Sequence, residues 1–253
     1  QFGVIESNAN GEIIGFWEKP ENPPPMPGNP KMCLASMGNY LFQTDVLVNE
    51  IVRDAHQVGS AHDFGKSIVS SMVGHKRTYV YDFATNRHHD QEEKEYGYWR
   101  DVGTLDAYWE ASMDLIQVDP IFNLYNHNWP IRSTYQHLPP AKFVHECDDD
   151  GRHGYAVDSL VSPGCIISGG LVRQSILATS VHVHSWAEVH QSVIGEGCEI
   201  GRHVKLNKVI LDKFVTIEPH VQIGLNADHD RARGLTVTDT GIVAVPKGMH
   251  VKE

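Results

Sequence analysis

Single aliphatic residues recur at a fixed, short spacing through the last hundred residues of the chain. The spacing runs six, six and five residues, so that each set of three repeats 17 positions later. The positions are Leu160, Ile166, Val172, then Leu177, Val183, Val189, then Ile194, Ile200, Leu206, and then Leu211, Ile217, Ile223. Such a period, with small or polar residues between single aliphatics, is typical of a solenoid of short strands. We therefore predict a prism-shaped β-helix in which each of these aliphatic side chains points inward.

Two glycines and the end of the repeat add detail to this β-helix. Gly195 and Gly201 directly follow the inward positions Ile194 and Ile200. Glycine adopts backbone angles that other residues avoid, so we predict that these two glycines form corners. The tail after Gly224 is expected to leave the repeat.

In the first half of the chain, segments whose apolar residues have the spacing of a strand alternate with segments whose apolar residues have the spacing of a helix. Segments 2–6 and 12–17 read as two strands joined by a turn at Asn10-Gly11, and 34–42 and 78–83 as two further strands, the first of them buried. The proline-rich stretch 20–30 is expected to be an extended surface loop, and 86–95 a mobile loop. Strands that alternate with helices predict an α/β domain.

Three helices are expected in the same half. Thr44 can cap the first, whose predicted inner face is Val48, Ile51, Val52 and Ala55. Residues 66–73 form the second, shorter helix. The third begins after a cap at Thr104, carries one apolar side from 105 to 116 and ends before Pro120. We place a domain at 1–125, a connection at 126–159 and the β-helix domain at 160–253.

Composition and charge narrow the function classes. The chain has 253 residues, 41% hydrophobic and 21% charged, with no apolar run of the roughly 20 residues that cross a bilayer. It shows no basic start followed by an apolar stretch, so we expect no secretory signal. Four scattered cysteines fit reduced thiols, so a cytoplasmic protein is expected. The whole net charge of −11 lies in residues 1–150, which argues against nucleic-acid binding. This negative charge does not exclude a small phosphorylated ligand held by one or two lysines.

Three short motifs could carry chemistry, and each has a structural alternative. Lys19 can hold a phosphate beside Glu18, although a surface ion pair explains both residues as well. Ser36 precedes Gly38 in an apolar run, which suggests close approach of a ligand or simply a bulge. Asp101 can meet a hydroxyl or Mg²⁺, or it can cap the helix near Thr104.

Histidines are numerous, and five of the 16 stand on the predicted β-helix: His182, His184, His190, His203 and His220. Imidazoles from neighbouring coils could form a three-histidine zinc site. Their dispersal over polar positions favours solvated surface histidines instead. The cluster from His62 to Lys66 is interpreted as a turn into a helix, with Lys66 near a ligand as the alternative. No Gly-rich phosphate loop is present in the sequence.

Six motifs in order resemble those of the bacterial ADP-glucose pyrophosphorylases (glucose-1-phosphate adenylyltransferases), and the resemblance covers the whole chain. They are Glu18-Lys19-Pro20, Ser36-Met37-Gly38, His62-Asp63-Phe64-Gly65-Lys66, Tyr98-Trp99-Arg100-Asp101-Val102-Gly103-Thr104, Asn128-Trp129-Pro130-Ile131-Arg132 and Pro139-Pro140-Ala141-Lys142-Phe143. The resemblance implies a partial Rossmann-like α/β nucleotidyltransferase domain followed by a left-handed parallel β-helix of hexapeptide repeats.

The resemblance also implies a reaction and residue roles. ATP and α-D-glucose 1-phosphate would give ADP-glucose and diphosphate with Mg²⁺, for glycogen synthesis. Gly3 would contact the sugar nucleotide, Lys19 the glucose phosphate, and Glu18 and Ser36 the glucose hydroxyls. Asp101 would touch glucose or share the metal.

Assembly and regulation follow from the same resemblance. Family members are typically homotetramers controlled by anionic metabolites, and Arg173, Arg231 and Arg233 are candidate effector contacts. The family's Gly-rich loop and metal-binding aspartate lie upstream of Gln1, so we expect this chain to be incomplete and inactive alone. Three alternatives stay open: a hexapeptide-type acyltransferase, a zinc hydratase and a non-catalytic regulatory or assembly subunit.

Overall fold

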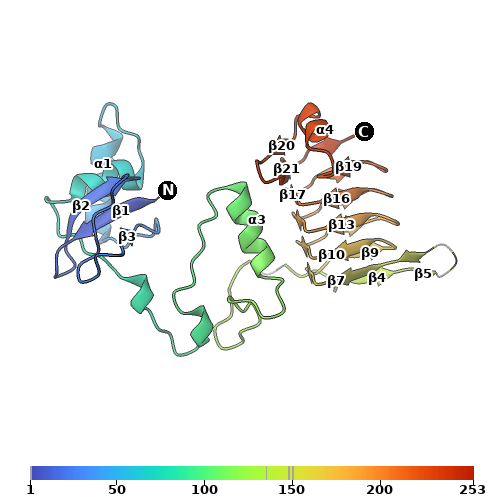
Figure 1. Ribbon diagram of the computed structural model, residues 1–253, viewed down its shortest axis with the longest axis horizontal. Helices are drawn as coiled ribbons and strands as arrows, with labels where there is room; N and C mark the ends of the chain where they lie inside the picture. The colour runs from blue at the N-terminus through green and yellow to red at the C-terminus, as the bar shows by residue number, and fades with distance from the viewer. Residues whose placement is uncertain (1, 135, 148, 150) are drawn as a thin grey trace. The chain divides into compact units, whose positions relative to one another are not determined.

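The computed structural model describes residues 2–134, 136–147, 149 and 151–253. The chain forms two compact units, residues 1–86 and 87–253, and each is considered by itself. The first holds a small sheet with helices, and the second is dominated by stacked short strands (Figure 1). Within the described ranges, no helix is long and apolar enough to span a membrane.

A three-stranded sheet forms the centre of the first unit. Strands β1 (Gly3–Ser7) and β2 (Ile13–Glu18) make the expected antiparallel hairpin. Gly11, with a φ of 77°, occupies the turn and donates its N–H to the carbonyl oxygen of Asn8. Strand β3 (Leu34–Ala35) pairs with the other edge of β1, so that the order is β2-β1-β3 and both described pairings are antiparallel.

Two other predicted strands are wrong in extent. The strand expected over 34–42 stops at Ala35, and Leu41 is fully exposed instead of buried. Gly38 explains this ending, because it turns the chain at a φ of 74° while its N–H donates to the Ser36 hydroxyl. Segment 78–83 makes one isolated antiparallel bridge, between Tyr79 and Glu12, before the 3₁₀ turn η2 (Phe83–Thr85).

The helices of the first unit are α1 (Thr44–Ala55), η1 (Phe64–Val69) and α2 (Ser70–Met72). The predicted inner face of α1 is wrong, because Val48, Ile51 and Val52 are 41–52% exposed while Glu50 and Asp54 are buried. Gln43 rather than Thr44 occupies the cap position. Glu50 lies 2.8 Å from Arg53 and 3.7 Å from Lys76. These partners offset the cost of burying a carboxylate.

In the second unit, helix α3 (Leu105–Asp114) follows the 3₁₀ turn η3 (Glu93–Glu95). The cap predicted at Thr104 is confirmed, since its hydroxyl accepts the N–H of Ala107 at 3.1 Å. The segment expected to be a loop over 86–95 ends in η3, where the Glu95 side chain is buried and accepts the N–H of Asn123 at 2.8 Å.

The apolar side of α3 packs on the β-helix. Met113 is buried with Val193, Ile210 and Ile242, and Leu105, Trp109 and Ile116 pack against this cluster. The indole N–H of Trp109 donates to the carbonyl oxygen of Gln191 at 2.7 Å. The helix is therefore fixed to the β-helix by apolar contacts and one directed hydrogen bond.

Three sheets form the faces of the β-helix (Figure 1). The first face has the order β19 (Gln222–Ile223), β16 (Lys205–Asn207), β13 (Glu188–His190), β10 (Leu171–Arg173), β7 (Tyr155–Val157). The second has the order β20 (Thr236–Val237), β21 (Val243–Val245), β17 (Val209–Leu211), β14 (Val193–Ile194), β11 (Ile176–Leu177), β8 (Leu160–Val161). The third has the order β22 (His250–Val251), β18 (Thr216–Ile217), β15 (Glu199–Ile200), β12 (His182–Val183), β9 (Ile166–Ser168), β4 (Lys142–Val144). A separate hairpin joins β5 (Glu146–Cys147) to β6 (Arg152–His153).

All strand pairs within the three faces are parallel except β20 with β21, as the left-handed β-helix prediction requires of its coils. From Val172 onward the predicted inward positions are confirmed, because each of these aliphatics is at most 1% exposed. They form one continuous core along the axis of the β-helix.

The first coil departs from the 17-residue period. Leu177 pairs with Val161, and Val183 pairs with Ile167, so these coils are offset by 16 residues. Ile167 is fully buried, whereas Ile166 is 38% exposed and Leu160 is only half-buried. The predicted inward positions Leu160 and Ile166 are therefore wrong by one residue.

A shortened corner accounts for this offset. The chain passes from Ile167 to Val172 through Gly169-Gly170, one residue fewer than between the corresponding positions of the next coil. Gly169 has a φ of 71°, and a Cβ on Gly170 would lie 2.9 Å from the carbonyl oxygen of His184. Two glycines thus permit a tighter turn than side chains would.

Three columns of left-handed residues mark the corners of the β-helix. Their φ angles lie between 45° and 80°, and they comprise Gly164, Ser180, Gly197, Phe214; Gly169, Trp186, His203, His220; and Asp158, Gln174, Gln191, Lys208. The corner role predicted for Gly195 and Gly201 is wrong, since neither has a positive φ. A Cβ on Gly201 would lie 2.6 Å from the carbonyl oxygen of Ile217, so this glycine permits close approach of the next coil.

A ladder of serine hydroxyls runs inside one corner. The Ser159 hydroxyl accepts the N–H of Ser175, the Ser175 hydroxyl that of Ser192, and the Ser192 hydroxyl that of Val209, all at 3.1 Å. Ser175 and Ser192 are fully buried and also donate to the carbonyl oxygens of Arg173 and His190. Each hydroxyl therefore satisfies a backbone group of the following coil.

The chain leaves the repeat after Gly224 as predicted, but it then returns. Helix α4 (Ala227–Ala232) and β20 form the excursion, after which β21 pairs with β17 and β22 with β18. At the other end, β4 and β7 pair with β9 and β10 although they lie within 126–159. The ranges 1–125, 126–159 and 160–253 stay a prediction.

Candidate functional site

One end of the three-stranded sheet gathers four of the predicted site residues. Gly3 on β1 pairs with Glu18 on β2, and Lys19 follows, its N–H donating to the carbonyl oxygen of Phe2 at 3.2 Å. Ser36 follows β3, and its N–H donates to the carbonyl oxygen of Gly3 at 2.8 Å. The sheet register thus brings Gly3, Glu18, Lys19 and Ser36 together although they are spread over 34 residues of sequence. We call this group the sheet-end cluster.

Lys19 presents an accessible cation. Its side chain is 62% exposed, and its ammonium lies 4.0 Å from a carboxylate oxygen of Glu18. An ion pair this long and exposed contributes little to stability, so the ammonium can bind another anion at low cost. The backbone of Lys19 adopts a φ of 47°, which is unfavourable for a residue with a side chain and is often found at functional positions.

Gly3 and Ser36 are fixed by local packing. A Cβ on Gly3 would lie 2.8 Å from the ring of Phe16, so the absence of a side chain lets that ring cross β1. The Ser36 hydroxyl lies 3.1 Å from the hydroxyl of Tyr40. Tyr40 in turn belongs to an aromatic group with Phe42 and Phe64, whose ring centroids are 6.1–6.2 Å apart. The Ser36 side of the cluster therefore adjoins a group of three aromatic rings.

A second polar group in the first unit centres on Asp54. The buried carboxylate accepts the Ser60 hydroxyl at 2.5 Å and lies 2.9 Å from Nδ1 of His62. These hydrogen bonds, from Ser60 first and then His62, lower the pKa of Asp54. Sequence reasoning missed this residue, because an acid near the end of an amphipathic helix gives no signal that it will be buried.

The motif from His62 to Lys66 is a turn into a helix, as expected. Asp63 caps η1 and accepts the N–H of Lys66 at 2.8 Å. Lys66 also lines an open hollow of about 500 Å³ together with four serines, Ser60, Ser67, Ser70 and Ser71.

Asp101 lies in the second unit and is exposed. Its carboxylate accepts the N–H of Gly103 at 3.1 Å, in a tight turn just before the Thr104 cap. Asp101 is not part of a cluster of three or more metal-ligand residues in the described part of the chain. Mg²⁺ prefers carboxylates completed by water and substrate phosphate oxygens. The described residues here offer it one carboxylate, so an ion at Asp101 would depend on phosphate oxygens from a ligand.

The three candidate effector arginines have different surroundings. Arg173 on β10 is exposed. Arg231 is half exposed and lies 3.3 Å from Asp228 within α4. Arg233 is 13% exposed, pairs with the buried Asp230 and donates to the carbonyl oxygen of Gln222 at 2.6 Å. Arg233 thus fastens α4 to β19, whereas the other two guanidinium groups face solvent.

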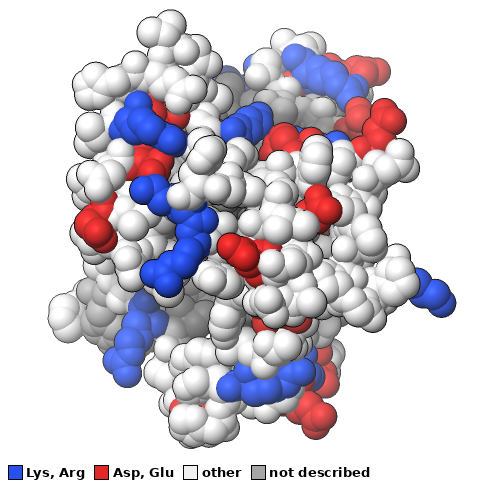
Figure 2. Space-filling view, turned by 90° about the vertical axis from the view of Figure 1, so that its left-hand side faces the viewer, with Lys and Arg blue, Asp and Glu red and all other residues white. Residues whose placement is uncertain are grey.

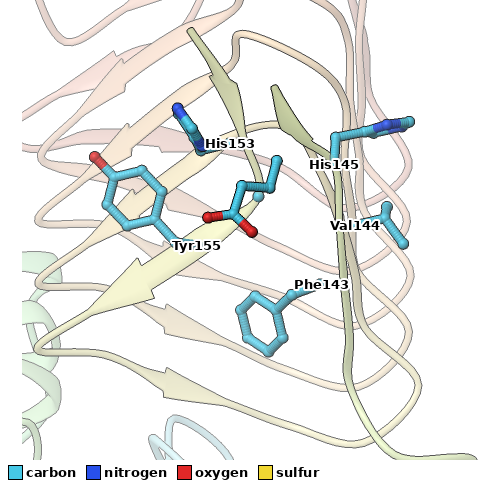
Figure 3. A pocket seen from close by; sticks show the side chains of 7 residues that line it. Phe143, Val144, His145, His153 and Tyr155 are labelled. Atoms are coloured by element: carbon cyan, nitrogen blue, oxygen red, sulfur yellow. The ribbon is translucent and has the colours of Figure 1, made fainter. Parts of the chain in front are cut away.

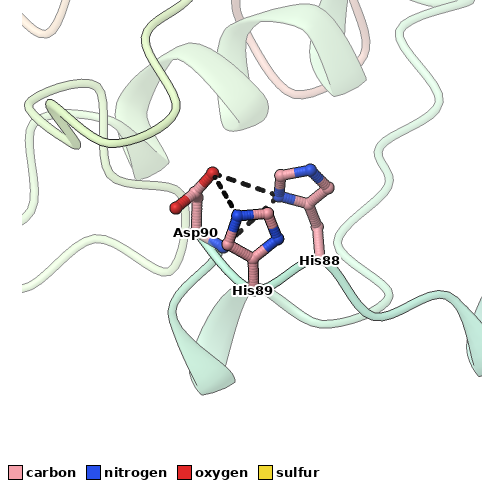
Figure 4. Close-up of side chains that lie close together, drawn as sticks. All are labelled: His88, His89 and Asp90. Carbon is pink, nitrogen blue, oxygen red and sulfur yellow. Dashed lines mark hydrogen bonds and ion pairs between the residues drawn. The ribbon is translucent and has the colours of Figure 1, made fainter.

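Among the described residues of the second unit, histidines form two candidate metal-ligand clusters and take part in an aromatic stack along the β-helix. His88, His89 and Asp90 are neighbours in a loop (Figure 4). His182, His184 and Glu199 lie on the third face of the β-helix. Partial burial, and then the neighbouring His184, lower the pKa of His182. Trp186, His203 and His220 stack along one corner, with centroids 4.8 Å apart.

An open hollow of about 670 Å³ lies at the first coil. Phe143, His153 and Tyr155 are on one side of β4, while Val144 and His145 are on the other (Figure 3).

On the molecular face drawn in Figure 2, basic and acidic side chains are interspersed among the described residues.

Comparison with known proteins matches both halves of the chain. A family model described as nucleotidyl transferase matches residues 1–118, and one described as GlmU-like, C-terminal hexapeptide, matches 139–245. A glucose-1-phosphate adenylyltransferase of Anaeromyxobacter sp. (strain Fw109-5) is 53% identical over 253 residues, and one of Anaeromyxobacter dehalogenans (strain 2CP-C) is 54% identical. That of Rhodopirellula baltica (strain DSM 10527 / NCIMB 13988 / SH1) is 45% identical over 249 residues.

These alignments cover 98–100% of this chain but 55–61% of the relatives, so the chain spans about three fifths of their length. The matched regions agree with the two kinds of structure described above, a small α/β segment and a parallel β-helix. By its sequence, the chain resembles, over 98–100% of its own length, part of the proteins named glucose-1-phosphate adenylyltransferase.

Proposed function

We propose that this chain takes part in the transfer of an adenylyl group from ATP to α-D-glucose 1-phosphate, giving ADP-glucose and diphosphate. The proposal takes its substrate from the printed name of the relatives. The sheet-end cluster supports it, because an exposed ammonium and a carboxylate at the end of β2 and a hydroxyl just after β3 flank the same end of β1. A sugar phosphate requires this combination of one cation and several hydrogen-bonding groups.

Each residue of the cluster has a distinct role in this proposal. Lys19 binds the phosphate of glucose 1-phosphate as a point charge. Glu18 and Ser36 bind glucose hydroxyls, and the backbone of Gly3 contacts the sugar nucleotide. Asp101 contacts glucose or contributes one ligand to Mg²⁺, which would neutralise charge on the phosphates.

The chemistry is a displacement at phosphorus. An oxygen of the glucose phosphate attacks the α-phosphorus of ATP, a new P–O bond forms, and the bond to the leaving diphosphate breaks. Positioning dominates in such a reaction, because holding two reactants in line replaces a bimolecular encounter. The backbone hydrogen bonds that hold Lys19 and Ser36 to β1 and its flank support this positioning role for the sugar phosphate.

The binding step is testable on the 253-residue chain by calorimetric titration with glucose 1-phosphate. Lys19→Ala should weaken binding by at least about tenfold, the effect of losing one charge-assisted hydrogen bond. Lys31→Ala removes the same charge from the exposed proline-rich loop and should leave affinity unchanged within about twofold. Equal losses in both variants, or no binding by the folded parent chain, would contradict the role of Lys19.

Further aspects of the proposal concern the whole protein. A cytoplasmic homotetramer working in glycogen synthesis and controlled by anionic metabolites is the context we propose. Arg173 and Arg231 support effector binding better than Arg233, because their guanidinium groups are the exposed ones. Replacing Arg231 by Gln should weaken the response to an anionic effector such as a sugar bisphosphate, and replacing Arg233 should instead lower thermal stability.

A further inference from the structure

The third face of the β-helix brings two histidines of one coil next to a glutamate of the following coil. His182 and His184 flank Val183, which is fully buried, so both imidazoles lie outside the β-helix core. The parallel register of β12 and β15 sets Glu199 directly beside His182. Strand alternation and coil stacking therefore place all three side chains on one outer patch, which we call the His–His–Glu patch.

The ligand atoms of this patch converge. One carboxylate oxygen of Glu199 lies 3.1 Å from Nε2 of His184 and 3.4 Å from Nδ1 of His182. All three candidate ligand atoms lie within 4.8 Å of one another. Two ligands that each lie about 2.0–2.2 Å from one zinc ion are separated by about 3–3.5 Å. The nitrogen-to-oxygen spacings already meet this requirement.

The backbone beneath the patch is held on both strands. The N–H groups of His182 and His184 donate to Cys198 and Ile200 at 3.0 and 2.9 Å, and that of Glu199 donates to Val215 at 2.9 Å. The three side chains are 29%, 35% and 50% exposed, so an ion can enter from solvent. Ligands on rigid strands lose little freedom when they bind a metal.

The other histidine cluster lacks these properties. His88, His89 and Asp90 are consecutive loop residues, and Nδ1 of His88 lies 3.3 Å from the backbone N–H of Asp90, which donates to it (Figure 4). That hydrogen bond occupies the lone pair that a metal would need. The His88 ring also stacks on Trp129, with centroids 4.2 Å apart.

We propose that His182, His184 and Glu199 bind a divalent transition-metal ion of the zinc class, with water completing the coordination sphere. Two imidazoles and one carboxylate suit zinc and similar ions better than magnesium, which prefers oxygen ligands. The ion replaces the contacts of His184 and His182 with Glu199 by metal–ligand bonds, and each neutral imidazole binds through its unprotonated nitrogen while its N–H proton resides on the other ring nitrogen. It links two consecutive coils and leaves positions open toward solvent.

Calorimetric titration of the full 253-residue chain with ZnCl₂ tests this proposal. The measurements use a Cys33→Ser background, because the exposed thiol of Cys33 is a competing zinc ligand. We expect one zinc site whose affinity falls at least about tenfold in Glu199→Gln and in His184→Gln. His190→Gln is the matched control, since His190 is similarly exposed and pairs with Glu188 at 3.8 Å, yet belongs to no three-residue cluster in the described chain.

The control should keep zinc affinity within about twofold, and MgCl₂ should give no heat at this site. Circular dichroism spectra and thermal midpoints of each variant, recorded without metal, establish that the β-helix is folded. Zinc should raise the midpoint of the parent chain and not that of Glu199→Gln. Equal zinc affinity in all four proteins, or no binding to the folded parent, would overturn the proposal.

Discussion

The register of the first coil can be tested with two neighbouring isoleucines. Ile167 is fully buried and aligns with Val183, whereas Ile166 is 38% exposed and aligns with His182. Ile167→Ala and Ile166→Ala make the same chemical change one residue apart. Any difference between them therefore reports which side chain faces the core.

The expected magnitudes follow from burial. Isoleucine to alanine removes three carbons, worth about 0.8 kcal/mol each when fully buried, or about 2.4 kcal/mol before the residual cavity is counted. With the cavity, Ile167→Ala should lower the free energy of unfolding by about 2–5 kcal/mol. Ile166 is 38% exposed and leaves no closed cavity, so its loss should be about 1.5 kcal/mol or less.

Urea denaturation of the parent chain and both variants, followed by circular dichroism, measures the two changes. Because the chain has two compact units, the comparison uses the transition followed by tryptophan fluorescence in a Trp17→Phe background, in which every remaining tryptophan lies in the second unit. If Ile166→Ala were as destabilising as Ile167→Ala, the 16-residue offset of the first coil would be refuted. The uninterrupted 17-residue period would then hold from residue 160.

Three further outcomes are expected. Gly201→Ala should destabilise the β-helix by about 1–3 kcal/mol, because the new Cβ would lie 2.6 Å from the carbonyl oxygen of Ile217; an unchanged denaturation midpoint would contradict that contact. Burial raises the pKa of Cys198 to about 11, so iodoacetamide at about pH 8 should label Cys33 and spare Cys198 in the folded chain, as peptide mass mapping can determine. The lowered pKa of Asp54 stabilises the fold above the unfolded value of 3.8, and this contribution is lost as pH falls through the lower folded value. Asp54→Asn should accordingly lose less thermal stability between about pH 6 and about pH 3 than the parent, and parallel losses in the two proteins would count against this linkage.

The β-helix was largely predictable because its core residues recur at a fixed spacing along the sequence. A single inward aliphatic per strand, repeated at 17 residues, identifies the faces from Val172 onward without knowledge of any distant contact. The register of the first coil was not predicted, because the 17-residue spacing of the later coils does not show that one corner of the first coil is a residue shorter. Gly169-Gly170 was the signal available, and its meaning depends on the approach of His184 from the next coil.

The first unit was harder to predict because its burial is decided by partners remote in sequence. Helix α1 has an apolar face by its spacing, yet Glu50 and Asp54 are its buried residues. Lys76 forms an ion pair with Glu50, and Ser60 and His62 are hydrogen-bonded to Asp54. The sheet-end cluster shows the same dependence. Its residue types were identifiable from motifs, but their proximity follows from the pairing of β1 with both β2 and β3.

The serine ladder at one corner carries a consequence for the growth of this fold. Because every rung is both filled by the preceding coil and offered to the next, a coil inserted between Ser175 and Ser192 with its own serine in place would leave no backbone group unsatisfied. Lineages can thus lengthen the prism by whole coils that carry this serine, and the 16-residue spacing of Ser159 from Ser175 shows that a coil one residue shorter also keeps the chain of hydroxyls.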